Sequence, residues 1–405
     1  MAAPTLTPST VLASTAARQG LGAQPFAGDI PALASALVGL HATEPTSIYL
    51  SAWARLASFT RDDMERALFE ERGVVRWLAM RRTLWVVAAD DVPLVHQACA
   101  PRLLGPEERR LRQLMVLGGL ADEMGASARA AQIEADILAV VGELEQAFGT
   151  DISARVPEMK TTYPYALDKP YGGRFSLGSR INSVVCLRGG MVRTKPKGGW
   201  RSNQYSYVLR ERWLPGVDPE SMDPAEARCG LVRRYVQAFG PVSLDDVQWW
   251  TGFTKGQVRQ AVVALGTQLA PVRVQGEHEE QWLPAEGVED VLSAVPLDAT
   301  RVSLLPTLDP LVMATKHRRR LMDAEGYALL HDRNGNAGPS ILAGGRVVGG
   351  WVQRSDGPVV WRLFEDLGAE ATHALEAQAA RLEVFLEGER VMPNFPTPLM
   401  RELRN

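Results

Sequence analysis

Basic and aromatic side chains fill residues 169–210, and no acidic residue interrupts them. This segment holds nine basic groups in a chain whose formal net charge is −3, so the rest of the chain is markedly acidic. Basic groups interleaved with aromatic rings suit phosphate neutralisation and stacking on bases or sugars. The basic residues are Lys169, Arg174, Arg180, Arg188, Arg193, Lys195, Lys197, Arg201 and Arg210, and the aromatic ones are Tyr171, Phe175, Trp200, Tyr205 and Tyr207. A polyanion, nucleic acid first, is the favoured ligand; the alternative is a solvent-exposed hairpin without one.

Metal and nucleotide chemistry find little support in the sequence. The three cysteines and six histidines are dispersed and form no C-x-x-C pair, which argues against a disulfide framework and against a zinc site. The pairs Gly344-Gly345 and Gly349-Gly350 lack the lysine and the strand-to-helix context of a phosphate-binding loop. We therefore expect no metal ion and no cofactor.

The length and composition are those of a globular protein. A chain of 405 residues, 46% apolar and 22% charged, is expected to form two to four domains. The N-terminus lacks the pattern of a secretory signal, and the longest apolar run, Leu84 to Ala89, is far shorter than the roughly 20 residues that span a bilayer. The expectation is a cytoplasmic monomer that does not bind membranes.

The clearest structural unit lies within residues 225–283. Its pattern predicts three helices, with Ser243 and Thr254 capping the second and third and Gly252 at the turn between them. Two short strands, 272–274 and 281–283, are expected to follow. Three helices followed by a hairpin indicate a winged helix.

The same order recurs twice upstream with little residue identity. In the second copy the wing is the basic segment, with strands 191–194 and 204–209; in the first, strands 74–80 and 83–88 form the wing. Beyond residue 298 the apolar period changes to two, which predicts strands, with a hairpin turn at Gly344-Gly345 and a final helix over 372–387. The strands predicted there are 302–305, 327–330, 341–343, 347–352 and 359–364.

The expected fold class is therefore α+β, with three tandem winged-helix motifs followed by a small β-barrel-like C-terminal domain. The first unit, which contains the segment around His41, takes residues 1–105. The second, with the basic wing, takes 106–215; the third takes 216–297. The C-terminal β domain with its terminal helix takes 298–405.

Four ordered segments resemble the AlkZ/YcaQ-like bacterial DNA glycosylases, a winged-helix family that removes bulky or crosslinking alkylpurine adducts. They lie at Leu40–Leu56, at Val75–Leu84, at Arg193–Trp200, and at Leu304–Leu311 together with Gly345–Trp351. The resemblance runs from about residue 11 to 391. It implies a glycosylase that hydrolyses the N-glycosidic bond of alkylated purines, N7- or N3-substituted and bulky, in double-stranded DNA and leaves an abasic site.

The family typically has Gln-x-Gln or Gln-x-Asp at its catalytic motif, and the matching positions here read His41-Ala42-Thr43. An alkylated purine already carries positive charge, so the enzyme chiefly needs acceptors that hold a water and stabilise a cationic sugar. Neutral His41 could orient that water or take its proton, Thr43 offers a hydroxyl, and Glu44 could stabilise the sugar or act as a base. The alternative is that these residues cap the flanking helices and that catalysis has been lost.

The basic side chains are then expected to hold DNA. The predicted DNA-binding residues are Arg81, Arg82, Arg193, Lys195, Lys197, Trp200, Arg201, Lys316, Arg318 and Arg319, with His317 and Arg320 beside them. For residues 316–320 a solvated basic turn is the competing interpretation.

A non-catalytic DNA-binding regulator or damage binder is the alternative to a monofunctional glycosylase. A nuclease is disfavoured because no acidic cluster has metal-ligand spacing. Lyase activity is not predicted, because no lysine lies near His41 in the sequence.

Overall fold

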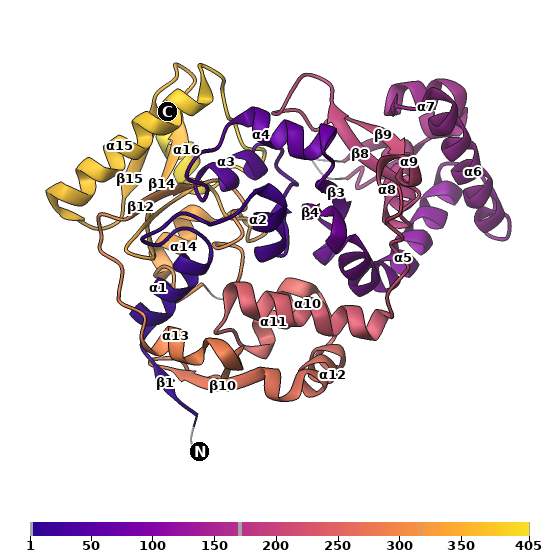
Figure 1. Cartoon of the computed structure of the whole chain (residues 1–405). Coiled ribbons are helices and arrows are strands. Elements are labelled where there is room, and N and C mark those ends of the chain that lie inside the picture. The colour runs from indigo at the N-terminus through magenta and orange to yellow at the C-terminus, as the bar shows by residue number, and fades with distance from the viewer. Residues whose placement is uncertain (1–2, 169–171, 317, 405) are drawn as a thin grey trace.

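The computed structural model describes residues 3–168, 172–316 and 318–404. Helices and strands alternate along the chain, which confirms the α+β class (Figure 1). Lys169, Tyr171 and His317, named above for their side chains, lie outside the described residues.

A six-stranded sheet joins the first two predicted units. Its strand order is β2-β4-β3-β8-β9-β5. The two halves meet where Arg76 of β3 pairs with Arg193 of β8. The bounds are β2 Leu40–His41, β3 Val74–Leu78, β4 Leu84–Ala88, β5 Ala147–Phe148, β8 Met191–Pro196 and β9 Tyr205–Leu209. The strands predicted for both wings are therefore present, and they belong to one continuous sheet.

Helices from the first two predicted units pack around this sheet. The sequence pattern does not predict α5 (Val92–Leu117), which runs through Pro101 and Pro106 and contains the expected boundary at residue 105. The N-terminal helices are α1 Pro8–Arg18, α2 Ile30–Ala36, α3 Ser47–Trp53 and α4 Arg61–Glu65, which continues as a π-helical turn Arg66–Glu70. Those of the second unit are α6 Ala126–Leu144, α7 Gly149–Arg155, α8 Gly178–Leu187 and α9 Arg210–Trp213.

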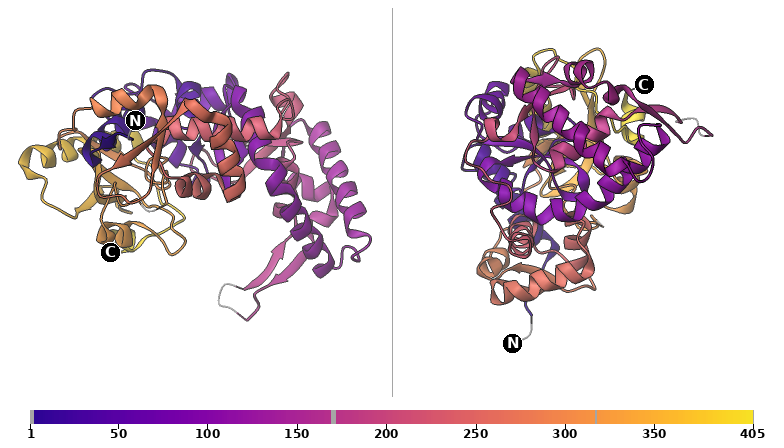
Figure 2. Two further views of the ribbon diagram at one scale, coloured as in Figure 1. Left: turned by 90° about the horizontal axis from the view of Figure 1, so that it is seen from below. Right: turned by 90° about the vertical axis from the view of Figure 1, so that its right-hand side faces the viewer.

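A two-stranded hairpin, β6 (Thr162–Tyr165) and β7 (Gly173–Ser176), projects from the helical end of the molecule (Figure 2). It points to the same side as the C-terminus.

The third unit matches its sequence pattern closely. Helices α10 (Pro224–Phe239), α11 (Leu244–Thr251) and α12 (Lys255–Leu265) precede the hairpin of β10 (Leu269–Val274) and β11 (Gln281–Pro284). Ser243 and Thr254 form capping boxes with Asp246 and Gln257, and Gly252 has the left-handed φ of 74° that the turn requires. The N-terminal strand β1 (Thr5–Leu6) adds to β10 in parallel, and α13 (Val288–Leu292) follows the hairpin.

The C-terminal part is an open sheet. Its order is β12-β13-β14-β15, with β12 Val302–Leu305, β13 Ser340–Ala343, β14 Arg346–Gln353 and β15 Val359–Leu363. Among the described residues β12 and β15 do not pair, so the expected barrel-like closure is wrong. The predicted strand 327–330 is also wrong, because Asp323 caps a helix there, α14 (Ala324–Leu330). Gly344 and Gly345, both with positive φ, form the predicted β13–β14 turn.

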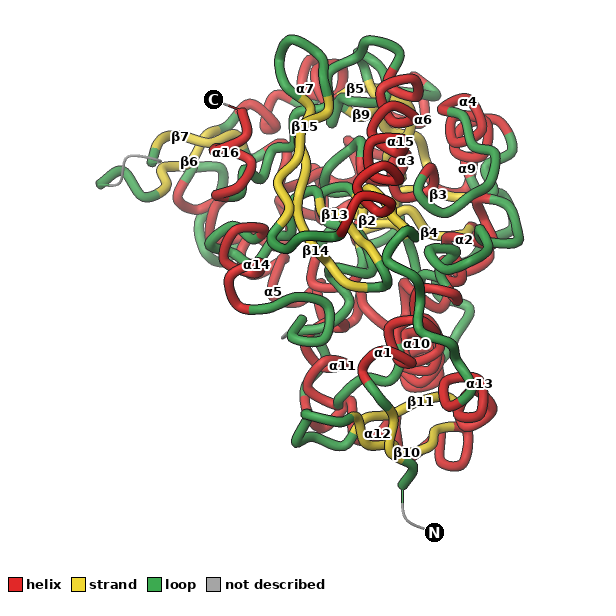
Figure 3. The backbone as a smooth tube through the Cα atoms, turned by 90° about the vertical axis from the view of Figure 1, so that its left-hand side faces the viewer, coloured by secondary structure: helices red, strands yellow, loops and turns green. Residues whose placement is uncertain are grey.

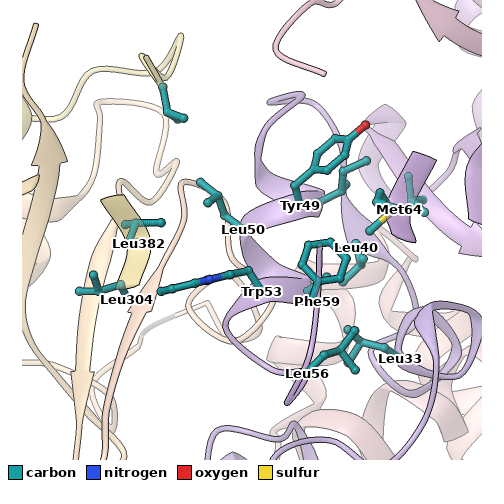
Figure 4. Packing of buried hydrophobic residues seen from close by; sticks show 14 of the residues in the cluster. Leu33, Leu40, Tyr49, Leu50, Trp53, Leu56, Phe59, Met64, Leu304 and Leu382 are labelled. Carbon is teal, nitrogen blue, oxygen red and sulfur yellow. The ribbon is translucent and has the colours of Figure 1, made fainter. Parts of the chain in front are cut away.

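The C-terminal sheet and its helix α15 (Gly368–Leu386) pack directly on the segment around His41. Trp53 of α3 lies 6.0 Å from Phe385 of α15 between ring centroids, and Figure 3 shows the two helices close together. The shared core includes Leu40, Tyr49, Leu50, Trp53, Leu304 and Leu382 (Figure 4). The last helix, α16 (Pro398–Arg404), closes over β14.

A buried ion pair fastens the same two regions. Arg55, just after α3, donates to both carboxylate oxygens of Asp309 at 2.8 and 2.7 Å, and neither side chain is exposed to solvent. Ser51 adds a hydrogen bond of 3.1 Å to Asp309. The ends of the chain thus form a single packed unit around the residues that follow β2.

None of the helices described has the length and apolar character needed to cross a membrane.

Candidate active site

The edge of the six-stranded sheet fixes the position of His41. Strand β2 pairs antiparallel with β4, so that Leu40 faces Val86 and His41 faces Trp85. Gly39 precedes the strand with φ 109°, and a Cβ there would lie 3.2 Å from the Trp85 ring, so the approach favours glycine. The His41 and Trp85 ring centroids lie 4.7 Å apart. Sheet pairing and aromatic packing therefore hold the imidazole in place.

A cavity of about 180 Å³ opens at this position. His41 and Thr43 line it from the motif, and Arg81 and Thr83 line it from the turn between β3 and β4. The other lining residues come from β4, the third unit and the C-terminal part: Trp85, Trp250, Leu308, Met313, Asn336 and Phe395. The cavity is mainly apolar and aromatic with a few polar groups, which is typical of small-molecule sites.

The His41 ring is neutral. It is 7% exposed, and burial, with a smaller contribution from the positive charge of Arg81, lowers the pKa of His41 to about 3. The backbone N–H of Thr43 donates to Nδ1 over 3.5 Å, a long hydrogen bond. Since a neutral imidazole carries one ring proton, that proton lies on Nε2 when Nδ1 accepts. His41 is then a weak base, suited to orienting a partner rather than to removing a proton.

Thr43 is half-buried beside His41, and its hydroxyl accepts a 3.4 Å hydrogen bond from the backbone N–H of Leu84. This contact ties the residues after β2 to β4. The hydroxyl proton stays available for donation, and the oxygen has a second lone pair.

The structure directs Glu44 elsewhere. Its side chain is buried, and one carboxylate oxygen accepts from both the backbone N–H and the side-chain amide of Asn394, each at 2.9 Å. Burial raises the pKa of Glu44, although the hydrogen bonds from Asn394 and Thr46 oppose this. Glu44 is not among the described residues that line the cavity. It joins the residues before α3 to the C-terminal segment; the N-cap of α3 is Thr46, which makes no side-chain cap bond.

Three cavity residues were not predicted from the sequence: Met313, Asn336 and Phe395. Each is more than 260 positions from His41, and no local motif marks them. The nearest sequence signal is the family-like segment Leu304–Leu311, and its Leu308 does line the cavity.

Two of the predicted DNA-binding arginines lie at the rim. Arg81 and Arg82 are exposed in the tight turn between β3 and β4, with φ 55° and 63°. The Arg81 guanidinium lies 4.5 Å from the centroid of the half-buried Trp249 ring, while Arg82 is paired with Glu107. Arg81 thus lines the cavity and is exposed to solvent at its rim.

The basic side chains of the second wing differ in whether other protein groups already bind them. Lys195 and Lys197 are exposed, and in the part of the chain that the structure describes neither forms an ion pair. Arg201 is paired with Glu389 at 2.6 Å, and Arg193 is half-buried and donates to Ser183.

Trp200, expected to contact DNA, is 6% exposed and packs edge-on against Tyr49 and Phe385. Its ring belongs to the core in this structure and is not available for stacking on a base.

The basic run after β12 also divides. Arg318 is 3% exposed and donates to the carbonyl oxygens of Val312 and Gly335, so it braces the fold instead of presenting charge. Burial lowers its pKa to about 10. Arg320 is paired with Glu277 at 2.7 Å. Lys316 lies 3.8 Å from Asp245, and Arg319 is exposed.

No cluster of three or more His, Cys, Asp or Glu side chains that could hold a metal ion occurs in residues 3–168, 172–316 and 318–404.

Comparison with known proteins adds two findings. A family model described as "DNA glycosylase AlkZ-like" matches residues 34–385. Among solved structures, the Streptomyces sahachiroi DNA glycosylase AlkZ is similar, with a TM-score of 0.72 and 18% sequence identity over 95% of this chain and 97% of that chain. At this identity the likeness shows a shared fold. No curated protein sequence matches significantly.

Proposed function

The chain belongs to the AlkZ-like DNA glycosylase family, and from that membership we propose that it acts as a monofunctional, monomeric glycosylase on alkylated purines in double-stranded DNA. It hydrolyses the N-glycosidic bond of N7- or N3-substituted purines, bulky adducts among them, and leaves an abasic site. The observation that carries the proposal is the cavity lined by His41 and Thr43, the residues that the sequence resemblance aligns with the family's catalytic motif.

The geometry suits a reaction that needs little proton transfer. A cationic alkylpurine leaves with the electrons of the glycosidic bond, which cancel its charge, so no strong acid is required. What remains is to place a water and to surround the cationic sugar with fixed dipoles. A neutral His41 and the Thr43 hydroxyl can do both, and the aromatic walls limit the access of other water molecules.

The residues proposed to hold the duplex are exposed basic side chains that form no ion pair with any residue that the structure describes. Lys195 and Lys197 on the second wing, Arg81 at the cavity rim and Arg319 in the C-terminal part are exposed. We expect each to contact a phosphate. Arg82, Arg193, Arg201 and Lys316 can contribute only by exchanging an existing partner for the DNA, and this lowers their expected effect.

Hydrolysis without strand cleavage follows from the lining of the cavity. Lyase chemistry needs an amine for a Schiff base. None of the described residues around the cavity is a lysine. The proposed product is therefore an intact strand with an abasic site.

An abasic-site assay tests the proposal. The protein is incubated with duplexes that contain N7-methylguanine or a bulky N7 or N3 adduct, and strands are then cleaved with alkali to reveal abasic sites. We expect cleavage only after alkali and only with lesion-containing duplex. The absence of product with every adduct would refute the proposed activity.

His41→Ala and a matched histidine variant separate chemistry from folding. His96 is also buried, packs edge-on against a tryptophan, and has its pKa lowered by burial to about 4. Its partner is Trp77, and His96 is not among the described residues that line the cavity. We expect His41→Ala to abolish most activity and His96→Ala to retain it, with thermal melting recorded for both.

A non-catalytic DNA-binding protein is the second candidate. The observation that favours it is Glu44, whose carboxylate is held by Asn394 away from the cavity. Sequence-specific binding to undamaged duplex without any abasic product would support this alternative.

A further inference from the structure

Asn336 is a carboxamide in the cavity that the motif does not account for. It lies in the loop between α14 and β13 and lines the cavity together with His41 and Thr43. It reaches that cavity from the C-terminal part of the chain, across the interface that the Arg55–Asp309 ion pair fastens.

The orientation of this amide is fixed by Asp332. The backbone N–H of Asn336 donates to Oδ1 of Asp332, and its side-chain Nδ2 donates to Oδ2, both over 2.9 Å. Partial burial by itself would raise the pKa of Asp332, but the hydrogen bonds from Asn336 and Asn334 lower it, so the carboxylate is ionised at neutral pH. A carboxylate accepts and cannot donate, so Nδ2 must face it and Oδ1 must point away.

The Oδ1 atom is left as an available acceptor. Within the described residues nothing donates to it, and it is not among the buried polar atoms without a partner, so a water molecule can reach it. Asn336, which lines the cavity, therefore has a carbonyl oxygen that no described residue occupies and an amide orientation that Asp332 fixes.

The motif residues make such an acceptor necessary. The Nδ1 atom of His41 is occupied by the N–H of Thr43, which leaves Nε2–H as a donor. The hydroxyl oxygen of Thr43 already accepts from Leu84 and has one lone pair left, so it can accept only one of the two protons of a water. A water that receives a hydrogen bond from His41 still needs acceptors for its own protons, because buried polar groups are stable only when paired.

We propose that Asn336 is a catalytic residue, whose Oδ1 accepts a hydrogen bond from the attacking water and faces the positive charge that develops on the sugar. This inference rests on the proposed glycosylase function. In the step, the water oxygen bonds to C1′, the C1′–N bond breaks with its electron pair going to the base, and the extra proton passes to bulk water. Asn336 thus supplies the carboxamide that His41-Ala42-Thr43 lacks compared with a glutamine motif.

Asp332 is a positioning residue in this scheme, because it acts only through the Asn336 amide. Replacing its carboxylate by an amide removes the reason for Nδ2 to face it, so that Asn336 can flip.

The test compares variants of one loop in single-turnover abasic-site formation with saturating protein. Asn336→Ala is expected to lower the rate by about 10², with unchanged DNA affinity. Asn334→Ala is the matched control, since its exposed side chain lies in the same loop and only its backbone contacts Asp332. Asp332→Asn should lower the rate by a smaller factor.

A rescue variant guards against a merely structural effect. In the Asn336→Ala background, His41→Gln restores a carboxamide to the cavity. The double variant should react at least about tenfold faster than Asn336→Ala alone. If Asn336 only stiffens the loop, His41→Gln will recover nothing, and the inference is overturned.

The outcomes distinguish this inference from the proposed function. An active wild type with an equally active Asn336→Ala variant overturns the role of Asn336 and leaves the glycosylase intact. A loss shared by Asn334→Ala, or accompanied by a lower melting temperature and weaker DNA binding, also overturns it. A wild type that is inactive with every adduct overturns both.

Discussion

The second wing and the cavity at His41 use their polar side chains in opposite ways. On the wing, Lys195 and Lys197 are exposed to solvent, and neither forms an ion pair with any residue that the structure describes. In the cavity, His41 is buried, neutral and held by a backbone N–H and a tryptophan ring. The wing can attract a polyanion at a distance, whereas the cavity acts only on a group that enters it.

This contrast shows that a high density of basic residues in the sequence does not mean that all of those side chains are available to bind DNA. The wing contains Arg193 and Arg201 as well, but the protein uses these side chains in contacts with Ser183 and Glu389. Among the described residues that line the cavity only Arg81 is charged, and the other polar side chains are neutral: His41, Thr43, Thr83 and Asn336. Preorganised dipoles in a site of low dielectric constant have large effects on a transition state.

The largest expected effect is on stability and concerns the Arg55–Asp309 ion pair, which connects the N-terminal and C-terminal parts of the chain. Asp309→Ala leaves Arg55 buried without its partner, and breaking a buried pair in this way costs about 3–5 kcal/mol of unfolding free energy. Chemical denaturation of the variant measures this loss. Arg66→Ala, which removes solvent-exposed ion pairs with Asp63 and Glu71, should change the free energy of unfolding far less, because solvent screens these pairs. Equal losses of stability in the two variants would contradict the stabilising role assigned to the buried Arg55–Asp309 pair.

His41→Ala should have the largest effect on chemistry. Loss of one preorganised group typically lowers the rate by about 10²–10³, and we expect that range in single-turnover abasic-site formation. DNA affinity should not change, because His41 is buried beneath the cavity rim. A variant that retained the wild-type rate while binding DNA less tightly would reverse the distinction between cavity and wing.

Lys195→Ala and Lys197→Ala should act on binding alone. Each removes one phosphate contact, so the slope of log affinity against log salt should fall by about one, uniformly across sequences. Arg201→Ala is the control, and we expect a smaller change because Glu389 already neutralises that guanidinium. Salt titrations followed by fluorescence anisotropy measure all three. A lower rate at saturating protein for either lysine variant would show that the wing takes part in chemistry.

The smallest expected effect is that of pH on the single-turnover rate. The pKa of His41 in the folded protein, about 3, lies below the ordinary value of 6.5, so the ring stays neutral and the single-turnover rate should be flat from about pH 5 to 8. Because the unfolded chain binds this proton more readily, acid should destabilise the fold progressively from about pH 6.5 down towards 3. A rate that falls with an inflection near pH 6.5 would contradict a buried neutral His41.

Much of the fold could be predicted because its signals are local. Ser243, Gly252 and Thr254 mark helix ends by side-chain and backbone chemistry within one turn, and all three were placed correctly. The errors have local causes too. Residues 327–330 have apolar side chains that suit a strand, but the Asp323 cap starts a helix there. The long α5 was missed because two prolines masked its continuity.

Charge pattern, capping residues and the ordered family-like segments, all read along the chain, determined the α+β class, the family and the position of the motif. The tertiary structure alone decided which side chains meet that motif. Asn336 and Phe395 line the cavity of His41, and Glu44 is drawn away by Asn394, because the C-terminal sheet packs on α3 across the Arg55–Asp309 pair. Side chains so far apart in sequence are brought together by burial of a shared core, which no local pattern encodes.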